Sequence, residues 1–454
     1  MSTSETGRCA ARGRLVADGL GLGFSGAVHV PGSARYDALR RPWRREIDQR
    51  PLVVAEAATA QDVRAAVRTA RDHELPFAVQ STGHGTVRPC DGGLLLATPR
   101  LNHIDIDPSR RVARVGAGAL WGDVVAAAAK VGLAPLSGYC PEVGVAGYTL
   151  GGGSGWLSRK HGYAADSLLR AEVVTADGDV LTADASQNAE LFWALRGGGG
   201  NFGVVTELSM RLYAVSRVYA GLKFFDGGNA GTLLRTYRDW AATEPDDLST
   251  SVFLLTLPPE VPAPLGGKQV VCVGACSLAA PAVTEQWLAP LWAAGGRPLT
   301  GELGPMTYPE LLRMFGPPEP SQAARERIDM FTELSDPVVA ALTGDLVDAS
   351  TAVNIRHWGG AMARPDAGAG PVGHRDVPFS VLLKSAATSS RIGDLMLANE
   401  LAPHRTGGAV LNFLTDPRLT ATAYTREDYR RLTALKRRHD PGNLLGHNHN
   451  IPPG

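Results

Sequence analysis

The chain has 454 residues, of which 44% are hydrophobic and 20% charged, and its 45 basic residues balance 45 acidic ones. A chain of this length exceeds what one hydrophobic core usually organises, so we expect two domains. The balanced charge gives no long-range attraction to polyanions or membrane surfaces, so neither nucleic acid nor a membrane is an expected partner. The odd count of five cysteines, without CxxC pairs, argues against a disulfide framework and a structural zinc site.

The N-terminal region lacks the continuous apolar stretch of a signal peptide, and no run of about 18 apolar residues occurs anywhere in the sequence. We therefore expect a cytoplasmic protein that is neither exported nor inserted in a membrane. Residues 1–35 are rich in Ser, Thr, Gly and Arg and show weak periodicity, which predicts a poorly ordered or loosely packed segment. Residues 1–44 are accordingly treated as a separate N-terminal segment.

A strand-helix-strand unit is predicted over residues 52–79. A short apolar strand comes first, and Thr59 with Asp62 three residues later then forms a capping box. Apolar residues follow at helical spacing, and Pro76 is expected to end the helix. The second strand leads directly into a glycine-rich loop that carries His84, and strand ends are places where ligand sites are often built.

The following segments also mix strands and helices. We predict a strand at 112–115 and an amphipathic helix over 120–128 that stops at Gly132, a residue suited to left-handed backbone. A hairpin is predicted over 172–182, and the Asp-Gly pair at its centre favours a type I′ turn. Alternation of apolar and polar residues over 204–212 predicts a half-buried strand.

A second region is expected over residues 216–426, because prolines punctuate it and it lacks a glycine-rich cradle. Strands are predicted near 251–257 and 269–277, with helices between them. We assign this region to substrate binding and residues 45–215 to a cofactor domain. Residues 427–454, which open with an amphipathic helix, are expected to form a separate closing element.

Two nucleophilic side chains lie in glycine-rich surroundings, His84 and Cys140. An imidazole and a thiol held against one electrophilic ring could both become attached to it, and isoalloxazine is a cofactor ring that accepts such attachments. Hydroxyls and sterically open amides near His84 could surround a pyrophosphate; they belong to Ser81, Thr82, Gly83 and Gly85. The glycines after Cys140 would let the backbone approach a flat ligand; they include Gly144, Gly147, Gly152 and Gly153.

Other motifs favour ordinary structural roles. Residues 198–203 match GxGxxG, but they follow a helical stretch and precede a strand, which is the reverse of the Rossmann order. Cys272 and Cys276 lie on one face of a predicted strand, where core packing is the expected role. The residues 447–450, His-Asn-His-Asn, predict a hydrogen-bonding tail rather than a metal site, so no metal is expected.

Five motifs together resemble the berberine bridge enzyme-like oxidases, which belong to the vanillyl-alcohol oxidase or PCMH-type superfamily of FAD-linked proteins. The resemblance runs in order from about residue 45 to the end of the sequence. Its motifs occupy residues 80–84, 138–147, 150–162, 196–203 and 440–451.

The resemblance implies an α+β fold in which a PCMH-type FAD-binding domain is joined to a substrate domain with an antiparallel sheet flanked by helices. It implies that the residue matching His84 bonds the 8α carbon of FAD and that the residue matching Cys140 bonds carbon 6. Such a bicovalent flavin has a raised reduction potential. The asparagines matching Asn448 and Asn450 belong to the closing segment at the cofactor, and Val205 is also assigned to the cofactor site.

The expected reaction is hydride transfer from a hydroxylated small molecule to flavin N5, with removal of a proton by a base and reoxidation by O2 to H2O2. Relatives commonly have tyrosine where Val410 stands, and some have tyrosine where Ser154 stands. Neither valine nor serine at an ordinary pKa can accept the proton unaided. The candidates for substrate contact or proton transfer are Tyr139, Tyr148, His357, His374 and Asn412.

The missing tyrosines favour a tailoring oxidase of secondary metabolism. Two alternatives use the same scaffold: an oxidative cyclase that closes a ring by two-electron oxidation, and a noncatalytic flavin-binding relative that has lost the base. Fold alone does not separate them, because activity depends on the site.

Overall fold

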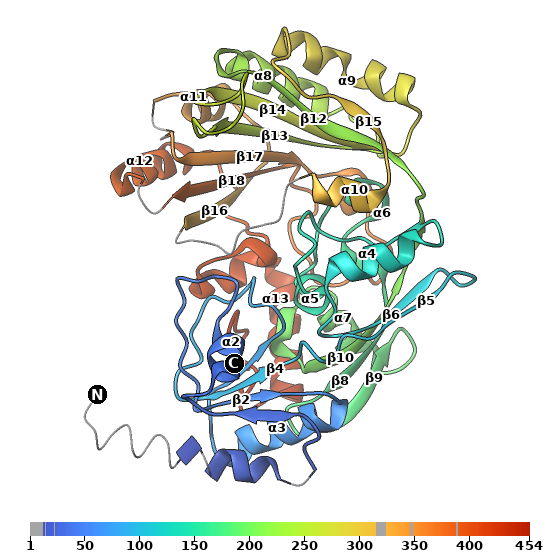
Figure 1. The fold of residues 1–454 in the computed structure, drawn as a ribbon, viewed down its shortest axis with the longest axis vertical. Coiled ribbons are helices and arrows are strands. Elements are labelled where there is room, and N and C mark those ends of the chain that lie inside the picture. The colour runs from blue at the N-terminus through green and yellow to red at the C-terminus, as the bar shows by residue number, and fades with distance from the viewer. Residues whose placement is uncertain are drawn as a thin grey trace.

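The computed structural model divides the chain into two parts, each built around β-sheet (Figure 1). The first part, called the two-sheet part after its four-stranded and five-stranded sheets, contains the strands between residues 27 and 214 and the final helix. A seven-stranded part contains the strands between 218 and 386. The expected α+β fold is confirmed. The structure describes residues 12–13, 15–21, 23–314, 324–345, 347, 349–386 and 389–454.

The first sheet has four strands in the order β1-β2-β4-β3, with β1 antiparallel to β2 and the other pairs parallel. Its strands are β1 (Ala27–His29), β2 (Val53–Glu56), β4 (Leu94–Ala97) and β3 (Phe77–Gln80). Helix α3 (Ala60–Asp72) connects β2 to β3 and buries its apolar face against this sheet. The predicted capping box is confirmed, since Thr59 and Asp62 each accept a hydrogen bond from the other's backbone N–H.

The second sheet is antiparallel, with the strand order β5-β6-β10-β8-β9. Its strands are β5 (Ile104–Asp107), β6 (Val112–Gly116), β10 (Val204–Arg211), β8 (Leu168–Val174) and β9 (Val180–Asp184). The strands predicted at 112–115 and 204–212 are therefore confirmed. Strands β7 (Leu133–Ala134) and β11 (Tyr213–Ala214) form a separate pair.

The hairpin between β8 and β9 is confirmed, but the predicted type I′ turn is wrong. Such a turn needs positive φ at both central residues, whereas Gly178 (φ +81) is the loop residue with positive φ. The Gly178 N–H donates to the Thr175 carbonyl at 2.9 Å, and the Thr175 N–H donates to the Asp179 carbonyl at 2.9 Å. The loop therefore has three residues and ends in a glycine bulge.

Helices α4 (Trp121–Ala129), α5 (Val145–Leu150) and α7 (Ala189–Leu195) pack on the two-sheet part, whereas α6 (Ser158–His161) contacts β13 of the seven-stranded sheet. Helix α4 confirms the helix predicted at 120–128, and Gly132 adopts φ +71 just after it. Trp121, Trp193 and the apolar face of β10 contribute to one core around these helices. That core holds the loops between the helices in place.

The seven-stranded sheet is antiparallel throughout, in the order β15-β12-β14-β13-β17-β18-β16. Its strands are β12 (Val218–Asp226), β13 (Leu248–Thr256), β14 (Gln269–Ser277), β15 (Leu303–Met306), β16 (Ala324–Phe331), β17 (Thr351–His357) and β18 (Phe379–Ala386). The strands predicted near 251–257 and 269–277 are confirmed as β13 and β14. Cys272 and Cys276 are buried on β14, as expected for core residues.

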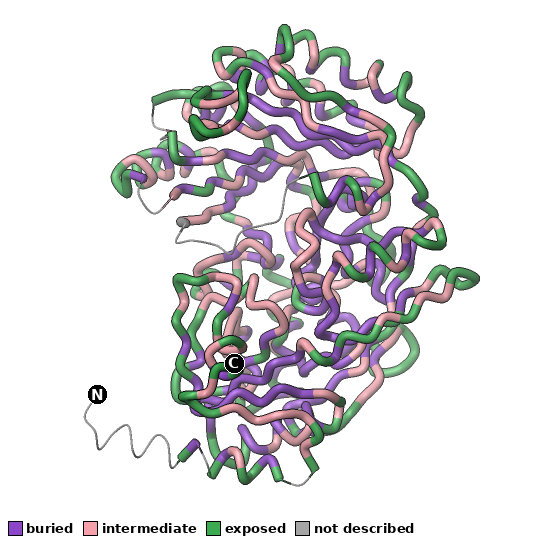
Figure 2. The backbone as a smooth tube through the Cα atoms, in the orientation of Figure 1, coloured by how far each residue is buried: buried purple, intermediate pink, exposed green. Residues whose placement is uncertain are grey.

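Helices cover one face of this sheet, and the face without helices is directed toward the two-sheet part (Figure 1). The covering helices are α8 (Ala230–Ala241), α9 (Pro281–Gly295), α11 (Asp336–Thr343) and α12 (Arg391–Leu401). Helix α10 (Tyr308–Arg313) instead contacts α4. Figure 2 shows the strands of the sheet as largely buried.

Part of the N-terminal segment packs into the core, contrary to expectation, although Leu15 is exposed. Residues 15–20 are helical, and Val16 (1% exposed) and Leu20 (3% exposed) lie one turn apart in the same core as α3. Strand β1 and helix α2 (Ala34–Arg40) follow. The expectation failed because the apolar residues are sparse but lie on one helical face; residues 1–11, including Cys9, are outside the described part.

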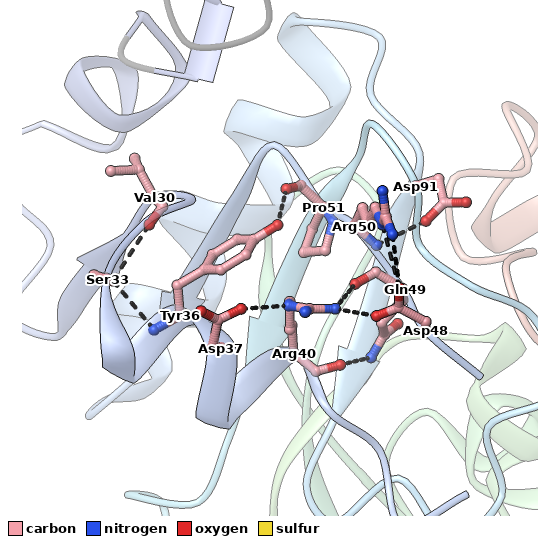
Figure 3. Close-up of polar contacts among 10 residues, drawn as sticks. All are labelled: Val30, Ser33, Tyr36, Asp37, Arg40, Asp48, Gln49, Arg50, Pro51 and Asp91. Atoms are coloured by element: carbon pink, nitrogen blue, oxygen red, sulfur yellow. Dashed lines mark hydrogen bonds and ion pairs between the residues drawn. The ribbon is translucent and has the colours of Figure 1, made fainter. Parts of the chain in front are cut away.

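Polar contacts tie α2 to the segment that leads into β2 (Figure 3). The Arg40 guanidinium binds the carboxylates of Asp37 and Asp48 and donates to the Gln49 carbonyl at 2.9 Å. The Tyr36 hydroxyl donates to the Pro51 carbonyl at 2.6 Å. These contacts fix residues 48–51 against α2.

Helix α13 (Arg426–His439) returns the chain to the two-sheet part and confirms the helix predicted at the start of the closing element. Thr425 caps it by accepting from the Asp428 N–H. Within the described residues, no helix combines the length and the apolar character needed to cross a membrane.

Candidate active site

The structure brings His84 and Cys140 together across 56 residues of sequence. The Sγ of Cys140 lies 4.0 Å from Nε2 of His84. His84 follows strand β3, whereas Cys140 lies in the loop between β7 and α5. The other ring nitrogen of His84, Nδ1, is 2.8 Å from the Thr82 hydroxyl, which fixes the orientation of the imidazole.

Burial keeps the His84 ring neutral at physiological pH. It lowers the pKa of His84 to about 4, so the imidazole retains a nucleophilic lone pair at pH 7. The ring also stacks on Trp43, with centroids 4.2 Å apart and planes inclined by 15°. Sequence reasoning missed Trp43, which lies in a charged segment without recognisable periodicity.

The Cys140 thiol is protonated at neutral pH. Burial first, and the nearby Glu142 carboxylate second, raise the pKa of Cys140 to about 11. Because the thiolate is the reactive form, attachment to an electrophile requires removal of the thiol proton. A carboxylate oxygen of Glu142 lies 3.5 Å from Sγ and can receive it.

The N-terminal segment braces the loop that carries His84. The Gln49 amide donates to the side-chain oxygen of Gln80 at 2.7 Å, and the Gln80 amide donates to the Leu39 carbonyl at 2.8 Å. The Trp43 N–H donates to the Thr82 carbonyl at 3.0 Å. These buried bonds fix both the end of β3 and the first residues of the loop.

Several predicted site glycines are required by their protein neighbours. Gly83 has φ +76, and a Cβ there would lie 2.5 Å from Cα of Pro42. A Cβ at Gly144 would lie 2.9 Å from the Ser81 hydroxyl. Gly152 and Gly153 have positive φ (+109 and +71), a conformation that favours glycine.

Gly85 and Gly147 differ from these glycines. A Cβ built at either position would meet no described protein atom within 4 Å, and neither residue has positive φ. The fold of the described chain therefore requires glycine at neither position. Close approach of a ligand to the backbone would account for both.

Four buried polar atoms around this region make no hydrogen bond within the described residues. They are Ser81 Oγ, Tyr148 OH, His449 Nδ1 and Asn450 Oδ1. Buried polar groups are costly unless they are hydrogen-bonded. Together with the open glycines, this set of donors and acceptors fits a large polar ligand such as FAD.

The C-terminal tail is hydrogen-bonded to the loop that carries His84. The side-chain oxygen of Asn448 accepts from the Val87 N–H at 2.9 Å, and its amide donates to the Gly85 carbonyl at 2.6 Å. Asn201 holds the tail from the other side, by donating to the His449 carbonyl and accepting from the Ile451 N–H, both at 2.9 Å. Asn201 was not identified from sequence, because its glycine-rich motif shows nothing of the contact with a tail some 250 residues later.

Val205, which was assigned to the cofactor site, lies in β10 and is 4% exposed. It pairs with Val173 of β8 just before an irregularity in the strand register. Its side chain belongs to the core of the two-sheet part.

The two histidines proposed for catalysis are engaged in internal contacts. His357 Nδ1 lies 2.5 Å from a Glu244 carboxylate oxygen and 3.1 Å from Nη1 of Arg159. His374 has φ +56, and its Nε2 lies 2.8 Å from the Thr422 carbonyl oxygen. The first arrangement joins the end of β17 to α6 and to the segment after α8, and the second joins the segment before β18 to the segment before α13.

Asn412 fastens the turn at the end of α5. Its side-chain oxygen accepts from the Gly153 N–H at 2.8 Å, and its amide donates to the Tyr148 carbonyl at 3.1 Å. Burial raises the pKa of Tyr148 well above 10, so its phenol is protonated at neutral pH. The structure thus brings Asn412 and Tyr148 together, beside the glycine run.

Tyr139 immediately precedes Cys140 and meets the seven-stranded sheet. The Arg356 guanidinium carbon lies 4.3 Å from the centre of the Tyr139 ring. Burial raises the pKa of Tyr139, and Arg356 partly opposes that shift. Arg356 was not identified from sequence, although its place in a strand that alternates polar and apolar residues is visible there. Val410 and Ser154, where relatives have tyrosine, are buried.

Comparison with known proteins identifies the family. A model of the FAD binding domain matches residues 51–184. Over 457 residues the chain is 31% identical to (R)-6-hydroxynicotine oxidase of Paenarthrobacter nicotinovorans, across 95% of this chain and 98% of the relative. The chain belongs to the berberine bridge enzyme-like FAD-linked oxidases.

Solved structures of the family share this fold. The berberine bridge enzyme-like protein 1 of Physcomitrella patens superposes with a TM-score of 0.85 at 21% identity, and 98% of each chain is covered. Glucooligosaccharide oxidase of Acremonium strictum superposes with a TM-score of 0.84 at 20% identity, over 97% of this chain and 99% of that one. The name given to that second structure specifies a 6-S-cysteinyl, 8α-N1-histidyl FAD.

This FAD-linked oxidase carries both nucleophiles, His84 and Cys140, inside the matched FAD binding domain. The PCMH-type domain and the antiparallel substrate sheet expected from the resemblance are confirmed. Within the described residues, no three His, Cys, Asp or Glu side chains gather as a metal site would require. The loop of His84, the loop of Cys140 and the C-terminal tail lie together in this domain.

Proposed function

We propose that this oxidase carries FAD on two covalent bonds, one to an imidazole nitrogen of His84 and one to Sγ of Cys140. The observation that carries the proposal is the 4.0 Å separation of Nε2 and Sγ, in loops whose open glycines leave room for a flat ring. The doubly attached flavin named for the Acremonium strictum enzyme supports the same arrangement.

The chain's own residues would orient this cofactor. Ser81 and Asn450 offer buried polar atoms without protein partners, and Gly85 and Gly147 permit close backbone approach. Trp43 and Thr82 hold the His84 ring in one orientation. When bound, FAD supplies a hydride acceptor at N5 and passes the electrons to O2, giving H2O2.

The substrate that we propose is a hydroxylated small molecule, oxidised as a tailoring step of secondary metabolism. The name of the 31%-identical relative supports oxidation of a small hydroxylated compound. Val410 is buried among apolar residues, including Tyr163 and Trp358. This apolar position supports a substrate other than the sugars named for the carbohydrate oxidases of this fold.

Acid precipitation tests the attachment. Wild-type protein that is denatured and washed should retain flavin absorbance, as should His84→Ala and Cys140→Ser alone, whereas the double variant should release it. Peptide mass mapping should place flavin on both residues in the wild type. A colourless wild-type pellet from flavin-containing protein would exclude covalent attachment.

Reoxidation tests the use of oxygen without a known substrate. The bound flavin is photoreduced under anaerobic conditions and mixed with air-saturated buffer, and peroxide is measured with a peroxidase-coupled dye. We expect the oxidised spectrum to return with peroxide equal to the flavin present. Flavin that stays reduced in air would show that another electron acceptor is needed.

A further inference from the structure

We propose that the substrate of this oxidase carries a planar anionic group, such as a carboxylate, and that Arg356 binds it. The inference deepens the proposed function and relies on it for the identity of the reaction. Three observations support it: the position of Arg356 in the sheet, the hydrogen bonds that hold its side chain, and the buried terminal nitrogen Nη1, which has no hydrogen-bond partner within the described residues.

Arg356 lies on the uncovered face of the seven-stranded sheet. Along β17, Val353 and Ile355 are fully buried in the core beneath the covering helices. Side chains alternate along a strand, so Arg356 points the other way, toward the two-sheet part. Its guanidinium carbon lies 4.3 Å from the Tyr139 ring centre and 5.4 Å from that of Phe413.

Both rings place the guanidinium beside the proposed flavin. Tyr139 is bonded to Cys140 in sequence, and Phe413 follows Asn412, whose side chain holds the Gly153 N–H. The charge of Arg356 also acts on the phenols of Tyr139 and Tyr148, whose pKa values it lowers against the larger effect of burial. Arg356 is therefore the cation that the substrate sheet presents to this loop cluster.

A chain of hydrogen bonds fixes the direction of the guanidinium. Its Nε donates to the side-chain oxygen of Asn354 at 2.7 Å, and the Asn354 amide donates to the Ser251 hydroxyl at 2.6 Å. Asn354 is 6% exposed and Ser251 is fully buried. With Nε engaged and one face on Tyr139, the terminal nitrogens are preorganised as a fork.

That fork is unpaired within the described residues. Nη1 of Arg356 is buried without a hydrogen-bond partner, and no described carboxylate forms an ion pair with this side chain. Other enclosed arginines are neutralised: Arg159 bonds the Leu248 carbonyl and pairs with Glu244, and Arg375 binds both carboxylate oxygens of Asp166. Arg356 is partly buried, and a buried donor such as its Nη1 is costly to leave unpaired, so a bound anion accounts for its retention.

Binding of small carboxylates tests this assignment in the holoprotein. Formate, acetate, benzoate and 4-hydroxybenzoate are titrated at fixed ionic strength, with benzamide as the uncharged analogue of benzoate. Two signals are read: the change in the visible flavin spectrum and the shift in melting temperature. We expect at least one carboxylate to bind saturably and, for benzoate, at least about tenfold more tightly than benzamide.

Arg356→Met removes the charge but retains an unbranched apolar stem, and Arg356→Lys retains charge without the fork. Arg391→Met, on the exposed surface of the covering helix α12, is the matched control. We expect Arg356→Met to weaken carboxylate binding at least about tenfold, Arg356→Lys to weaken it less, and Arg391→Met to leave it unchanged. Carboxylate binding unaffected in Arg356→Met overturns the proposal.

A wild type that responds saturably to none of the four carboxylates also overturns it. The melting-temperature signal separates this inference from the proposed function. If the purified protein carried no flavin but carboxylate still stabilised it through Arg356, the proposed function would fail and the anion site would stand. If the protein carried flavin but did not respond to carboxylates, the anion site would fail and the proposed function would stand.

Discussion

The Nζ of Lys436 lies 2.6 Å from a carboxylate oxygen of Asp440, and both side chains are buried, with 0% and 1% exposed. The same carboxylate accepts from the Leu444 and Leu445 N–H groups, each at 2.8 Å, where the tail begins. Nζ also donates to the Asn201 carbonyl at 3.0 Å. This pair therefore joins the end of α13 to both the tail and the glycine-rich segment before β10.

Asp440→Asn should destabilise the fold, because it leaves the Lys436 ammonium buried without its counter-charge. We expect the free energy of unfolding to fall by about 3–5 kcal/mol, measured by denaturant titration. Lys436→Met combined with Asp440→Asn should recover part of the loss. Glu427→Gln, an exposed change on the same helix, is the control; equal stability of Asp440→Asn and this control would contradict a structural role for the pair.

Asn412→Ala should loosen the turn after α5. The change leaves the Gly153 N–H and the Tyr148 carbonyl without their partner, at a cost of about 1–3 kcal/mol. Thermal and denaturant unfolding should show the loss, and Asn399→Ala on the exposed face of α12 should not. Unchanged stability in Asn412→Ala would mean that the turn is held by other contacts.

Glycine substitutions distinguish glycines that are needed for a ligand to approach the backbone from glycines that are needed for the chain to fold. Gly147→Ala should fold normally and even gain up to about 1 kcal/mol of helix propensity, because its Cβ meets no described atom within 4 Å. Flavin content per protein should nevertheless fall. Gly155→Ala is the contrasting variant, since its Cβ would lie 1.9 Å from the Ser137 carbonyl oxygen, and it should fail to yield folded protein.

These outcomes are read by circular dichroism and by the ratio of flavin to protein absorbance. A Gly147→Ala protein with full flavin content would place the cofactor away from α5. Misfolding of Gly147→Ala together with normal folding of Gly155→Ala would contradict the described backbone.

His161 should make the fold less stable in mild acid. Burial first, and Lys160 second, lower the pKa of His161 from 6.5 to about 4. Between these pH values the unfolded chain binds more protons than the folded one, so the free energy of unfolding falls as pH decreases from 6.5 to 4. His161→Phe removes the titrating group and can keep the stacking on Tyr213, whose ring centre is 3.9 Å away.

Stability is therefore measured against pH for three proteins. His161→Phe should lose less stability than the wild type between pH 6.5 and 4, whereas the exposed control His73→Gln should follow the wild type. Parallel curves for His161→Phe and the wild type would show that another group governs the acid response.

The sequence predicted those helices and strands whose residue patterns depend only on neighbouring positions. The Thr59–Asp62 box marked the start of α3, and alternation over 204–212 marked β10, because neighbouring residues alone set both patterns. Strand β4 was missed: Leu94–Ala97 is a continuous apolar run, fully buried within a parallel arrangement, and such short runs lack a diagnostic period.

Site residues could be predicted from sequence where a reactive side chain lies within a recognisable motif. His84 and Cys140 stood out because a nucleophile amid glycines is informative by itself. Trp43 and Arg356 did not, since their roles depend on contacts with His84 and Tyr139 that only the tertiary fold creates. Periodicity assigns Arg356 to a face of its strand, but it does not reveal which loop lies opposite.

The bond from the Val87 N–H to Asn448 spans 361 residues. Chains are synthesised from the N-terminus, and their domains tend to fold in that order. The loop around His84 therefore emerges from the ribosome long before Asn448, which anchors it. The segment stays incompletely anchored while the whole seven-stranded sheet is being translated. The loop of His84 can therefore reach its final anchored form only after residue 448 has been synthesised, as a late step in the completion of the fold.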